Sequence, residues 1–413
     1  MAARHHVSRV KRKASRSHVT LRVKRAVIFR MTIRILAIAT HGEAGPSTRF
    51  RVLQWEPYLR SWGCSLSVRA FFSAEMTVAF YQPGRLLTKA RDIVTGSVRR
   101  LATIASLARE ADVVLVHREI FPLGQRPLWN VLERFPGPII YDYDDAMFLP
   151  QRAGRGWLGW MERVDTPQAI MRLSEVVIAG NLFLADYARQ YARRVVVIPT
   201  CIDTARFVPR PHLARHDGKP VVGWIGSYTA SKYLHGLIGV LRAVARLRPF
   251  HLYVVGCDPV PPIEGVTIEQ AEWRLDREIQ DFQRCDVGLY PLWDDAWAKG
   301  KCAFKAIQSM ACGVPVVASA VGANRALIDD GVNGFLASTD TEWVDRLCQL
   351  LTDTSLQERL GRAGRQTIDA RYALPVHAHI LRTALGVPSQ RTGHAVTMVE
   401  SFAPAPAHDG VAP

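Results

Sequence analysis

Residues 300–319 read GKCAFKAIQSMACGVPVVAS, and this stretch decides the fold of the second half of the chain. Its segment 302–312 has apolar residues at helical spacing, and Gly313 supplies the stop expected just after a helix. The VPVVAS that follows is a short, β-branched, apolar run typical of a strand buried on both faces. The sequence therefore predicts a helix followed by a parallel strand.

Two lysines, Lys301 and Lys305, lie four residues apart at the start of this helix and would share one of its faces. Positive charges at a helix amino terminus oppose the helix dipole, and a bound anion would relieve that mismatch. The lysines are either solvated surface charges or a clamp for an anionic ligand.

Short apolar runs alternate with amphipathic segments along the chain, and the segments that we predict as helices include 48–62 and 157–173. The runs that we predict as strands are 33–39, 112–117, 138–142, 175–180 and 195–199, then 220–226, 250–256, 266–270, 286–292 and 314–319. Buried apolar strands separated by helices are typical of parallel sheets covered on both faces. Two such sets predict an α/β protein with two Rossmann-like domains.

The two sets of strands are separated by a stretch rich in proline and charge, and a chain of 413 residues is long enough for two domains. We predict an N-terminal domain over 31–199, a linker over 200–219 and a C-terminal domain over 220–386. The polar, Ala/Pro-rich residues 387–413 predict a disordered tail.

Residues 1–30 form a basic leader with ten Lys/Arg and no acid, and without these ten charges the net charge falls from +16 to +6. Such a leader fits a nucleic-acid or membrane arm or an organellar presequence. Met31, however, opens an ordinary first strand, so the leader is equally well interpreted as disordered or as not native. Because the basicity is confined to it, we predict no nucleic-acid partner.

The rest of the composition indicates the setting of the protein. No stretch approaches the ~20 apolar residues of a membrane span, and the seven scattered cysteines never form CxxC. A reduced, cytoplasmic setting is the simple inference. The residual positive charge allows peripheral contact with the inner face of a membrane.

Three carboxylates, Asp142, Asp144 and Asp145, follow the apolar run 138–142 in the sequence YDYDDAMF. Ligands of doubly wound sheets bind beyond the carboxyl ends of the strands, so this place suits a general base or the recognition of hydroxyl groups. A metal-binding DxD motif and a plain helix N-cap are the alternatives. We predict no bound metal.

Glycine-containing loops follow several other runs. In WIGSYTASKY, Gly226 permits a tight turn, Ser227 offers a hydroxyl and Lys232 lies near the start of the next helix. Backbone amides, a helix dipole and one lysine make a reasonable diphosphate cradle, although an exposed surface lysine would look the same. A second strand-to-helix turn begins at Gly322, and the loop 40–50 lacks the GxGxxG of dinucleotide-binding proteins.

Taken together, VVGWIGS…K, CDVGLYPL and KCAFKAIQSMACGVPVVASAVGANRALIDDGVNGFL resemble the carboxyl-terminal half of the GT-B glycosyltransferases, in particular the retaining group 1, or family 4, enzymes. The resemblance runs from about 220 to 372. VIPTCID resembles the interdomain segment of the family. GPSTRFRV, VHREIFP and YDYDDAMF resemble a subset acting in cell-surface polysaccharide assembly.

This resemblance implies two Rossmann-like domains facing each other across a cleft. It also implies transfer of a sugar from a nucleotide-diphosphate sugar to a glycan or lipid-linked acceptor, with retention of configuration, no essential metal and no cofactor. A nucleotide-sugar-binding protein that has lost transfer and a GT-B epimerase are the alternatives.

The chain departs from the family at the donor site. The family's diphosphate-binding Lys corresponds to Lys232, but its Arg corresponds to Ser227, and its two glutamates fall at Gly300 and Gln308. Gln308 can still hydrogen-bond a ribose hydroxyl, whereas Gly300 offers no carboxylate. Lys301 and Lys305 would replace the missing Arg.

The resemblance and the loop chemistry together give a set of candidate site residues. Stabilisation of the departing negative charge is the main requirement of the reaction, and no strong base is compulsory when configuration is retained. The catalytic candidates are Lys232, Lys301, Lys305, Asp142 and Asp145. The donor-binding candidates are Gly226, Ser227, Gln308, Gly322, Ala323 and Asn324. The acceptor-binding candidates are Gly45, Arg49, His117, Arg118 and Asp144.

Overall fold

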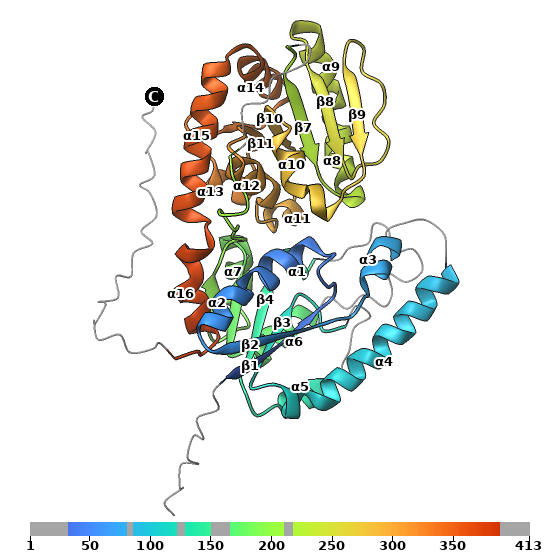
Figure 1. Cartoon of the computed structure of the whole chain (residues 1–413), viewed down its shortest axis with the longest axis vertical. Helices are drawn as coiled ribbons and strands as arrows, with labels where there is room; N and C mark the ends of the chain where they lie inside the picture. The colour runs from blue at the N-terminus through green and yellow to red at the C-terminus, as the bar shows by residue number, and fades with distance from the viewer. Residues whose placement is uncertain (1–31, 81–85, 122–128, 150–165, 210–217, 389–413) are drawn as a thin grey trace, which may run out of the picture. The chain divides into compact units, whose positions relative to one another are not determined.

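The computed structural model describes residues 32–80, 86–121, 129–149, 166–209 and 218–388. The predicted leader, nearly all of the predicted tail and residues 210–217 of the predicted linker lie outside these ranges. The described residues form two six-stranded sheets in which all neighbouring strands are parallel (Figure 1). The predicted α/β architecture is confirmed. None of the described helices is long and apolar enough to cross a membrane.

The first sheet has the strand order β2-β1-β3-β4-β5-β6, which reverses between β1 and β3. Its strands are β1 (Ile33–Ala39), β2 (Cys64–Ala70), β3 (Val113–His117), β4 (Ile139–Tyr143), β5 (Val176–Ala179) and β6 (Val195–Val197). The sequence prediction missed β2, because CSLSVRA alternates buried and exposed residues at the sheet edge and is no continuous apolar run.

The second sheet has the order β12-β11-β10-β7-β8-β9, which reverses between β7 and β10. Its strands are β7 (Val221–Ile225), β8 (His251–Val255), β9 (Thr267–Ala271), β10 (Val287–Tyr290), β11 (Val316–Ser319) and β12 (Phe335–Ala337). Ligands of such sheets bind in the crevice at the reversal, beyond the carboxyl ends of the strands. The loops after β1, β3, β7 and β10 are therefore the places to look for a site.

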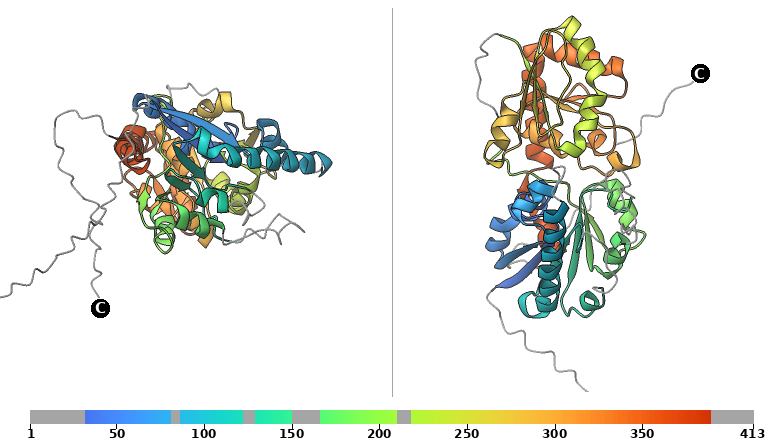
Figure 2. Two further views of the ribbon diagram at one scale, coloured as in Figure 1. Left: turned by 90° about the horizontal axis from the view of Figure 1, so that it is seen from below. Right: turned by 90° about the vertical axis from the view of Figure 1, so that its right-hand side faces the viewer.

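Successive residues of the central strands belong to different hydrophobic clusters, which shows that both faces of each sheet are buried. Leu36 and Ile38 of β1 belong to one cluster, and Ile35 and Ala37 belong to another. In the second sheet, Val254 and Val255 divide in the same way. Helices provide the covering layers (Figures 1 and 2), as the continuous apolar strands predicted.

The helices of the first half include two short ones where a single helix was expected over 48–62. A 3-10 turn, Leu53–Trp55, lies between them, and a proline stands in the first turn of each. The helices are α1 (Pro46–Arg51), α2 (Glu56–Ser61), α3 (Ala74–Phe80), α4 (Leu86–Glu110), α5 (Trp129–Glu133), α6 (Thr166–Leu173) and α7 (Leu182–Ala188). The amino-terminal part of the helix-like stretch 157–173 lies outside the described residues.

The second half of the chain ends by returning to the first sheet. Its helices are α8 (Ser231–Gly236), α9 (Ile238–Leu247), α10 (Glu278–Gln283), α11 (Ala296–Lys299), α12 (Phe304–Ala311), α13 (Ala323–Leu327), α14 (Asp340–Thr352), α15 (Thr354–Arg371) and α16 (Leu374–Ala384). Leu374 and Leu381 of α16 share a hydrophobic cluster with Ile35 of β1. The predicted C-terminal domain over 220–386 thus includes a helix that packs on the other sheet.

The stretch 300–319 folds only partly as predicted. Gly313 has a positive φ of 68° and ends α12, and β11 follows. However, Ala303 adopts a left-handed conformation, with φ of 55°, so that the helix begins at Phe304. Lys301 precedes this helix, and the prediction that Lys301 and Lys305 share a helical face is wrong.

Candidate active site

A chain of hydrogen bonds crosses the carboxyl ends of β3 and β4, at the reversal of the first sheet. His117, the last residue of β3, has its Nδ1 2.8 Å from Asp142 Oδ1 and its Nε2 2.8 Å from Ser47 Oγ. Ser47, on α1, donates its hydroxyl proton to Asp144 Oδ2 over 2.7 Å. His117 thus links the buried Asp142 carboxylate to Ser47 and, through Ser47, to Asp144.

Asp142 lies at the buried end of this chain. Its Oδ1 also accepts from Arg51 Nε at 3.1 Å, and its Oδ2 from Arg51 Nη2 at 2.5 Å. Burial would raise the pKa of Asp142, but Arg51 and His117 outweigh it and hold that pKa below its usual value. Because the carboxylate is buried and fully engaged, it orients His117 and does not itself reach a substrate, contrary to its prediction as a candidate base.

The outer end of the chain is held by Arg118. Its Nε donates to Asp144 Oδ1 and its Nη2 to Asp145 Oδ2, both at 2.6 Å. Burial would raise the pKa of Asp144, but Arg118 and His117 lower it well below the usual range. Arg118 has a positive φ of 63°, a strained conformation that is commonest at functional sites. Arg118 therefore fixes the acidic loop in place.

At the reversal of the second sheet, the loop after β7 presents an exposed lysine on aromatic rings. The Lys232 ammonium lies 5.0 Å from the ring centres of both Tyr233 and Trp293. Ser227 Oγ and Thr229 Oγ1 are 3.1 Å apart in the same exposed loop. The predicted diphosphate loop is thus exposed, and its lysine is held by cation–π contacts, with no acidic partner among the described residues.

The predicted turn at 322–324 lies against α11. Gly322 has φ of 52°, and a Cβ atom there would lie 2.9 Å from Lys299 Cα, so only glycine fits. The next two residues open α13. Asn324 is buried and donates from Nδ2 to Ser319 O at 2.9 Å, while its Oδ1 has no hydrogen-bond partner within the described part of the chain.

The acidic loop and the stretch 300–302 approach each other closely. A Cβ atom on Gly300 would lie 2.6 Å from Ala146 Cβ and 2.8 Å from Ala146 N. Cys302 Sγ lies 3.3 Å from Asp144 O, and Asn181 Nδ2 donates to Gly300 O at 3.1 Å. A glutamate at position 300, where the family resemblance would put one, has no room in this arrangement.

A second cluster of charges contains three of the predicted residues. Arg49 Nη2 lies 2.9 Å from Glu278 Oε1, to which Gln308 Nε2 also donates at 3.3 Å. Lys305 Nζ donates to Gln308 Oε1 at 3.0 Å. Burial lowers the pKa of Lys305 to about 8, against the opposing effect of Glu278. Arg49 and Gln308 thus have protein partners at the positions where acceptor and ribose contacts were expected.

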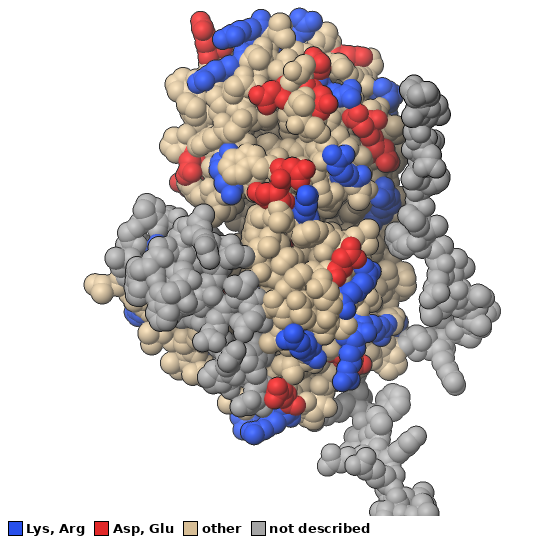
Figure 3. Space-filling model, turned by 180° about the vertical axis from the view of Figure 1, so that it is seen from behind, with Lys and Arg blue, Asp and Glu red and all other residues tan. Residues whose placement is uncertain are grey.

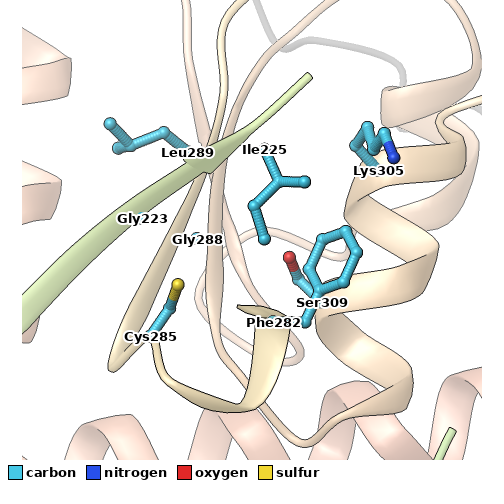
Figure 4. A pocket seen from close by; sticks show the side chains of 8 residues that line it. All are labelled: Gly223, Ile225, Phe282, Cys285, Gly288, Leu289, Lys305 and Ser309. Atoms are coloured by element: carbon cyan, nitrogen blue, oxygen red, sulfur yellow. The ribbon is translucent and has the colours of Figure 1, made fainter. Parts of the chain in front are cut away.

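A small pocket lies beneath Lys305, between α12 and strands β7 and β10 (Figure 4). Ile225, Phe282 and Leu289 contribute apolar side chains to its lining. The Lys305 nitrogen points away from Ile225 and Leu289 in Figure 4, and it lies 5.4 Å from the centre of the Phe282 ring. The pocket is therefore part of the packing of α12 on the sheet and offers little to a charged ligand.

Helix α1 contributes to two separate clusters of predicted residues. Helix α1 carries Ser47 into the hydrogen-bond chain of His117 and Arg49 into the cluster of Lys305. Gly45 is the buried N-cap of this helix. Lys301 lies apart from Lys305, with its ammonium 6.0 Å from the Trp297 ring.

Sequence reasoning missed several residues that these contacts single out, because their partners are far away in the chain. These are Ser47, Arg51, Asn181, Glu278 and Trp293. No group of three or more His, Cys, Asp or Glu side chains in the described ranges is placed to hold a metal ion.

Residues 219–353, which span most of the second sheet, match the family model of the group 1 glycosyl transferases. This confirms the predicted resemblance for that part of the chain. The D-inositol 3-phosphate glycosyltransferase of Stackebrandtia nassauensis is 30% identical over 276 residues, covering 55% of this chain and 59% of that protein. The enzyme of the same name from Segniliparus rotundus is 22% identical over 286 residues, covering 60% and 61%. The chain spans about three fifths of the length of these relatives.

Solved structures share the fold over most of the chain. Sucrose-phosphate synthase from Thermosynechococcus elongatus superimposes with a TM-score of 0.61 at 16% identity, covering 86% of this chain and 98% of that one. Anabaena HepE, solved in complex with UDP and glucose, gives 0.61 at 17% identity, covering 86% and 99%. The two parallel sheets therefore adopt the GT-B arrangement of two Rossmann-like domains.

Proposed function

From the GT-B fold and the group 1 match over residues 219–353, we propose that this chain is a glycosyltransferase. It transfers a sugar from a nucleotide-diphosphate sugar to a glycan or lipid-linked acceptor, with retention of configuration. The observation that carries the proposal is the coincidence of the family match with the switch point of the second sheet. The exposed lysine loop stands at that switch point.

The donor side of the reaction needs positive charge near the leaving diphosphate. Lys232 is exposed, has aromatic rings around its ammonium and forms no ion pair within the part of the chain that the structure describes. Its charge is therefore available to an anion. The turns at Gly226–Ser227 and Gly322–Asn324 would add backbone amides, and Lys301 a second charge. Charge stabilisation of this kind is usually the largest single contribution to such a reaction.

The acceptor side is supplied by the acidic loop. Asp145 has a side chain that is 18% exposed and is paired on one oxygen with Arg118. Burial and the negative charges of Asp295 and Asp145 raise the pKa of Tyr233 to about 12, so Asp145 lies within electrostatic reach of the residue next to Lys232. Asp144 and Ser47 lie beside it and can bind acceptor hydroxyls. With retention, the leaving phosphate itself can take the acceptor proton.

We expect the reaction to need neither a metal nor a cofactor. Arg51 and Arg118 already neutralise Asp142 and Asp144, the pair that would otherwise form a DxD site. A cytoplasmic enzyme would meet nucleotide sugars and lipid-linked acceptors at the inner membrane face.

The test is a panel of nucleotide sugars incubated with the purified chain, first by calorimetry and then with acceptors and mass detection of products. The acceptors should include inositol phosphate, because the relatives are named for it, and glycolipid extracts. Transfer with an unchanged anomeric configuration is the expected result. Binding without transfer or donor hydrolysis would favour the non-catalytic nucleotide-sugar-binding protein, and sugar-nucleotide interconversion without acceptor would favour the epimerase.

A further inference from the structure

Helix α4 presents an unpartnered apolar stripe to solvent. Leu87, Val94, Val98 and Leu101 are between 50% and 88% exposed, and at 100° per residue they lie within about 60° of one another around the helix. Ile104 and Leu107, about 90° and 150° round the helix from this stripe, pack in the core of the first sheet. The helix is therefore apolar on two sides, and only one of them has a protein partner in the described chain.

Arginines border the exposed stripe. Arg91 and Arg109 project about 50° from its axis, and Arg99 lies about 130° round the helix; all three are exposed. Of the two acids of the helix, Glu110 is 3.3 Å from Arg69 of β2, while Asp92 lies 3.3 Å from Arg91 and offsets part of its charge. Arg99 and Arg109 have no ion pair among the described residues. The surface around the stripe thus has an excess of positive charge.

The position of α4 leaves this stripe accessible. In Figures 1 and 2 the helix lies at the edge of the first sheet, and its amino-terminal half extends beyond the strands that it covers. On the face shown in Figure 3, by contrast, Lys and Arg are interspersed with Asp and Glu over the described residues.

We propose that the exposed face of α4, defined by Leu87, Val94, Val98 and Leu101, docks on an anionic lipid surface. Leucine and valine side chains enter the boundary between headgroups and acyl chains, and arginines beside them reach lipid phosphates with their guanidinium groups. This deepens the expectation of peripheral membrane contact but does not rest on the proposed transferase activity.

The dimensions and the charge favour a membrane over a second copy of the chain. The stripe from Leu87 to Leu101 is about 21 Å long and about 10 Å wide, far below the ~800 Å² that each partner of a standard protein interface buries. Two copies would also bring Arg91 and Arg109 of one helix toward those of the other. Like charges at an interface disfavour association.

The experiment is co-sedimentation of the full chain with phosphatidylcholine vesicles that contain or lack phosphatidylglycerol. The test variant is Val94→Gln/Val98→Gln, and the matched control is Leu247→Gln/Val332→Gln, which changes two similarly exposed apolar residues elsewhere. We expect the test variant to lose at least about tenfold in partitioning to anionic vesicles, the control to match the unchanged chain, and both to keep their thermal midpoints.

A second measurement separates α4 from the basic leader, which can itself bind anionic vesicles. Brominated lipid should quench the fluorescence added by Val98→Trp and leave that added by Val332→Trp unchanged, because only the first residue would enter the bilayer. Equal quenching of the two variants, or equal binding to vesicles without phosphatidylglycerol, would overturn the proposal. Concentration-dependent self-association abolished by Val94→Gln/Val98→Gln would instead assign the face to a second copy.

Discussion

Different kinds of groups lie at the carboxyl ends of the strands in the two sheets. In the first sheet, polar and charged side chains are hydrogen-bonded to one another: Arg51 to Asp142, Asp142 to His117 and Arg118 to Asp144. In the second, the loops after β7 and β11 offer backbone turns and an exposed lysine on aromatic rings. We therefore expect substitutions at the strand ends of the first sheet to change mainly the free energy of unfolding. Substitutions in the loops of the second sheet should change donor binding and turnover.

The largest effect is expected at the buried ion pair of the first sheet. Asp142→Asn leaves the Arg51 guanidinium buried without a counter-charge, which typically costs about 3–5 kcal/mol of unfolding free energy. Chemical denaturation would measure the loss. The exposed pair of Arg346 and Asp330 is the control, since Asp330→Asn should cost below about 1 kcal/mol. Equal costs at the two pairs would contradict the comparison.

The same carboxylate makes a pH-dependent contribution. The pKa of Asp142 is lowered in the folded protein. Its contribution to stability is therefore present above the unfolded value of about 4 and is lost as the pH falls through the folded value. The Asp142→Asn variant should lack this part of the acid sensitivity.

The second sheet is tested by Lys232→Ala. Loss of a charge that stabilises the leaving diphosphate should lower kcat by about 10²–10³-fold, while the free energy of unfolding should stay the same because the side chain is exposed. Initial rates with the accepted donor give the first quantity and denaturation the second. The control is Arg246→Ala, an exposed residue of α9. Full activity of Lys232→Ala would remove the second sheet from the donor site.

The close contact between Gly300 and Ala146 of the acidic loop is tested by Gly300→Ala. The added methyl would lie 2.6 Å from Ala146 Cβ, and forcing an extra carbon into such packing typically costs about 1–3 kcal/mol. Gly239→Ala in α9 has open space around its Cβ and should instead stabilise by about 0.5–1 kcal/mol. An unchanged free energy of unfolding in Gly300→Ala would show that the structure around Ala146 adjusts easily to an added carbon. The absence of a glutamate at position 300 would then not be explained by lack of space.

The smallest effect concerns the pH dependence of donor binding. The pKa of Lys305 is about 8 in the free protein, and a bound anion would raise it. Protonation and binding then favour each other, so donor affinity should be highest below pH 8 and fall by up to about tenfold per pH unit above it. Calorimetry of a nucleoside diphosphate between pH 7 and 9 measures this. Lys305→Arg should flatten the profile, and a flat profile in the unchanged chain would separate Lys305 from the donor.

How well the sequence predicted each feature depends on how far apart in the chain the interacting residues are. All ten predicted strands overlap a described strand within a few residues, the last of them VPVVAS as β11. The prediction missed the two edge strands β2 and β12, which contain no continuous apolar run of comparable length. The predicted shared face of Lys301 and Lys305 failed because Ala303 is left-handed, a choice that its sequence neighbours do not dictate.

The sequence by itself determined the two parallel sheets and the loops that carry the candidate site, because strands buried on both faces need continuous apolar runs and their carboxyl ends must carry the polar groups. Only the tertiary structure decided which charges pair. Arg51 and Asp142 are 91 residues apart, and Arg49 and Glu278 are 229 apart. The same holds for Gly300, whose lack of a side chain is explained by Ala146, a residue that only folding brings to it.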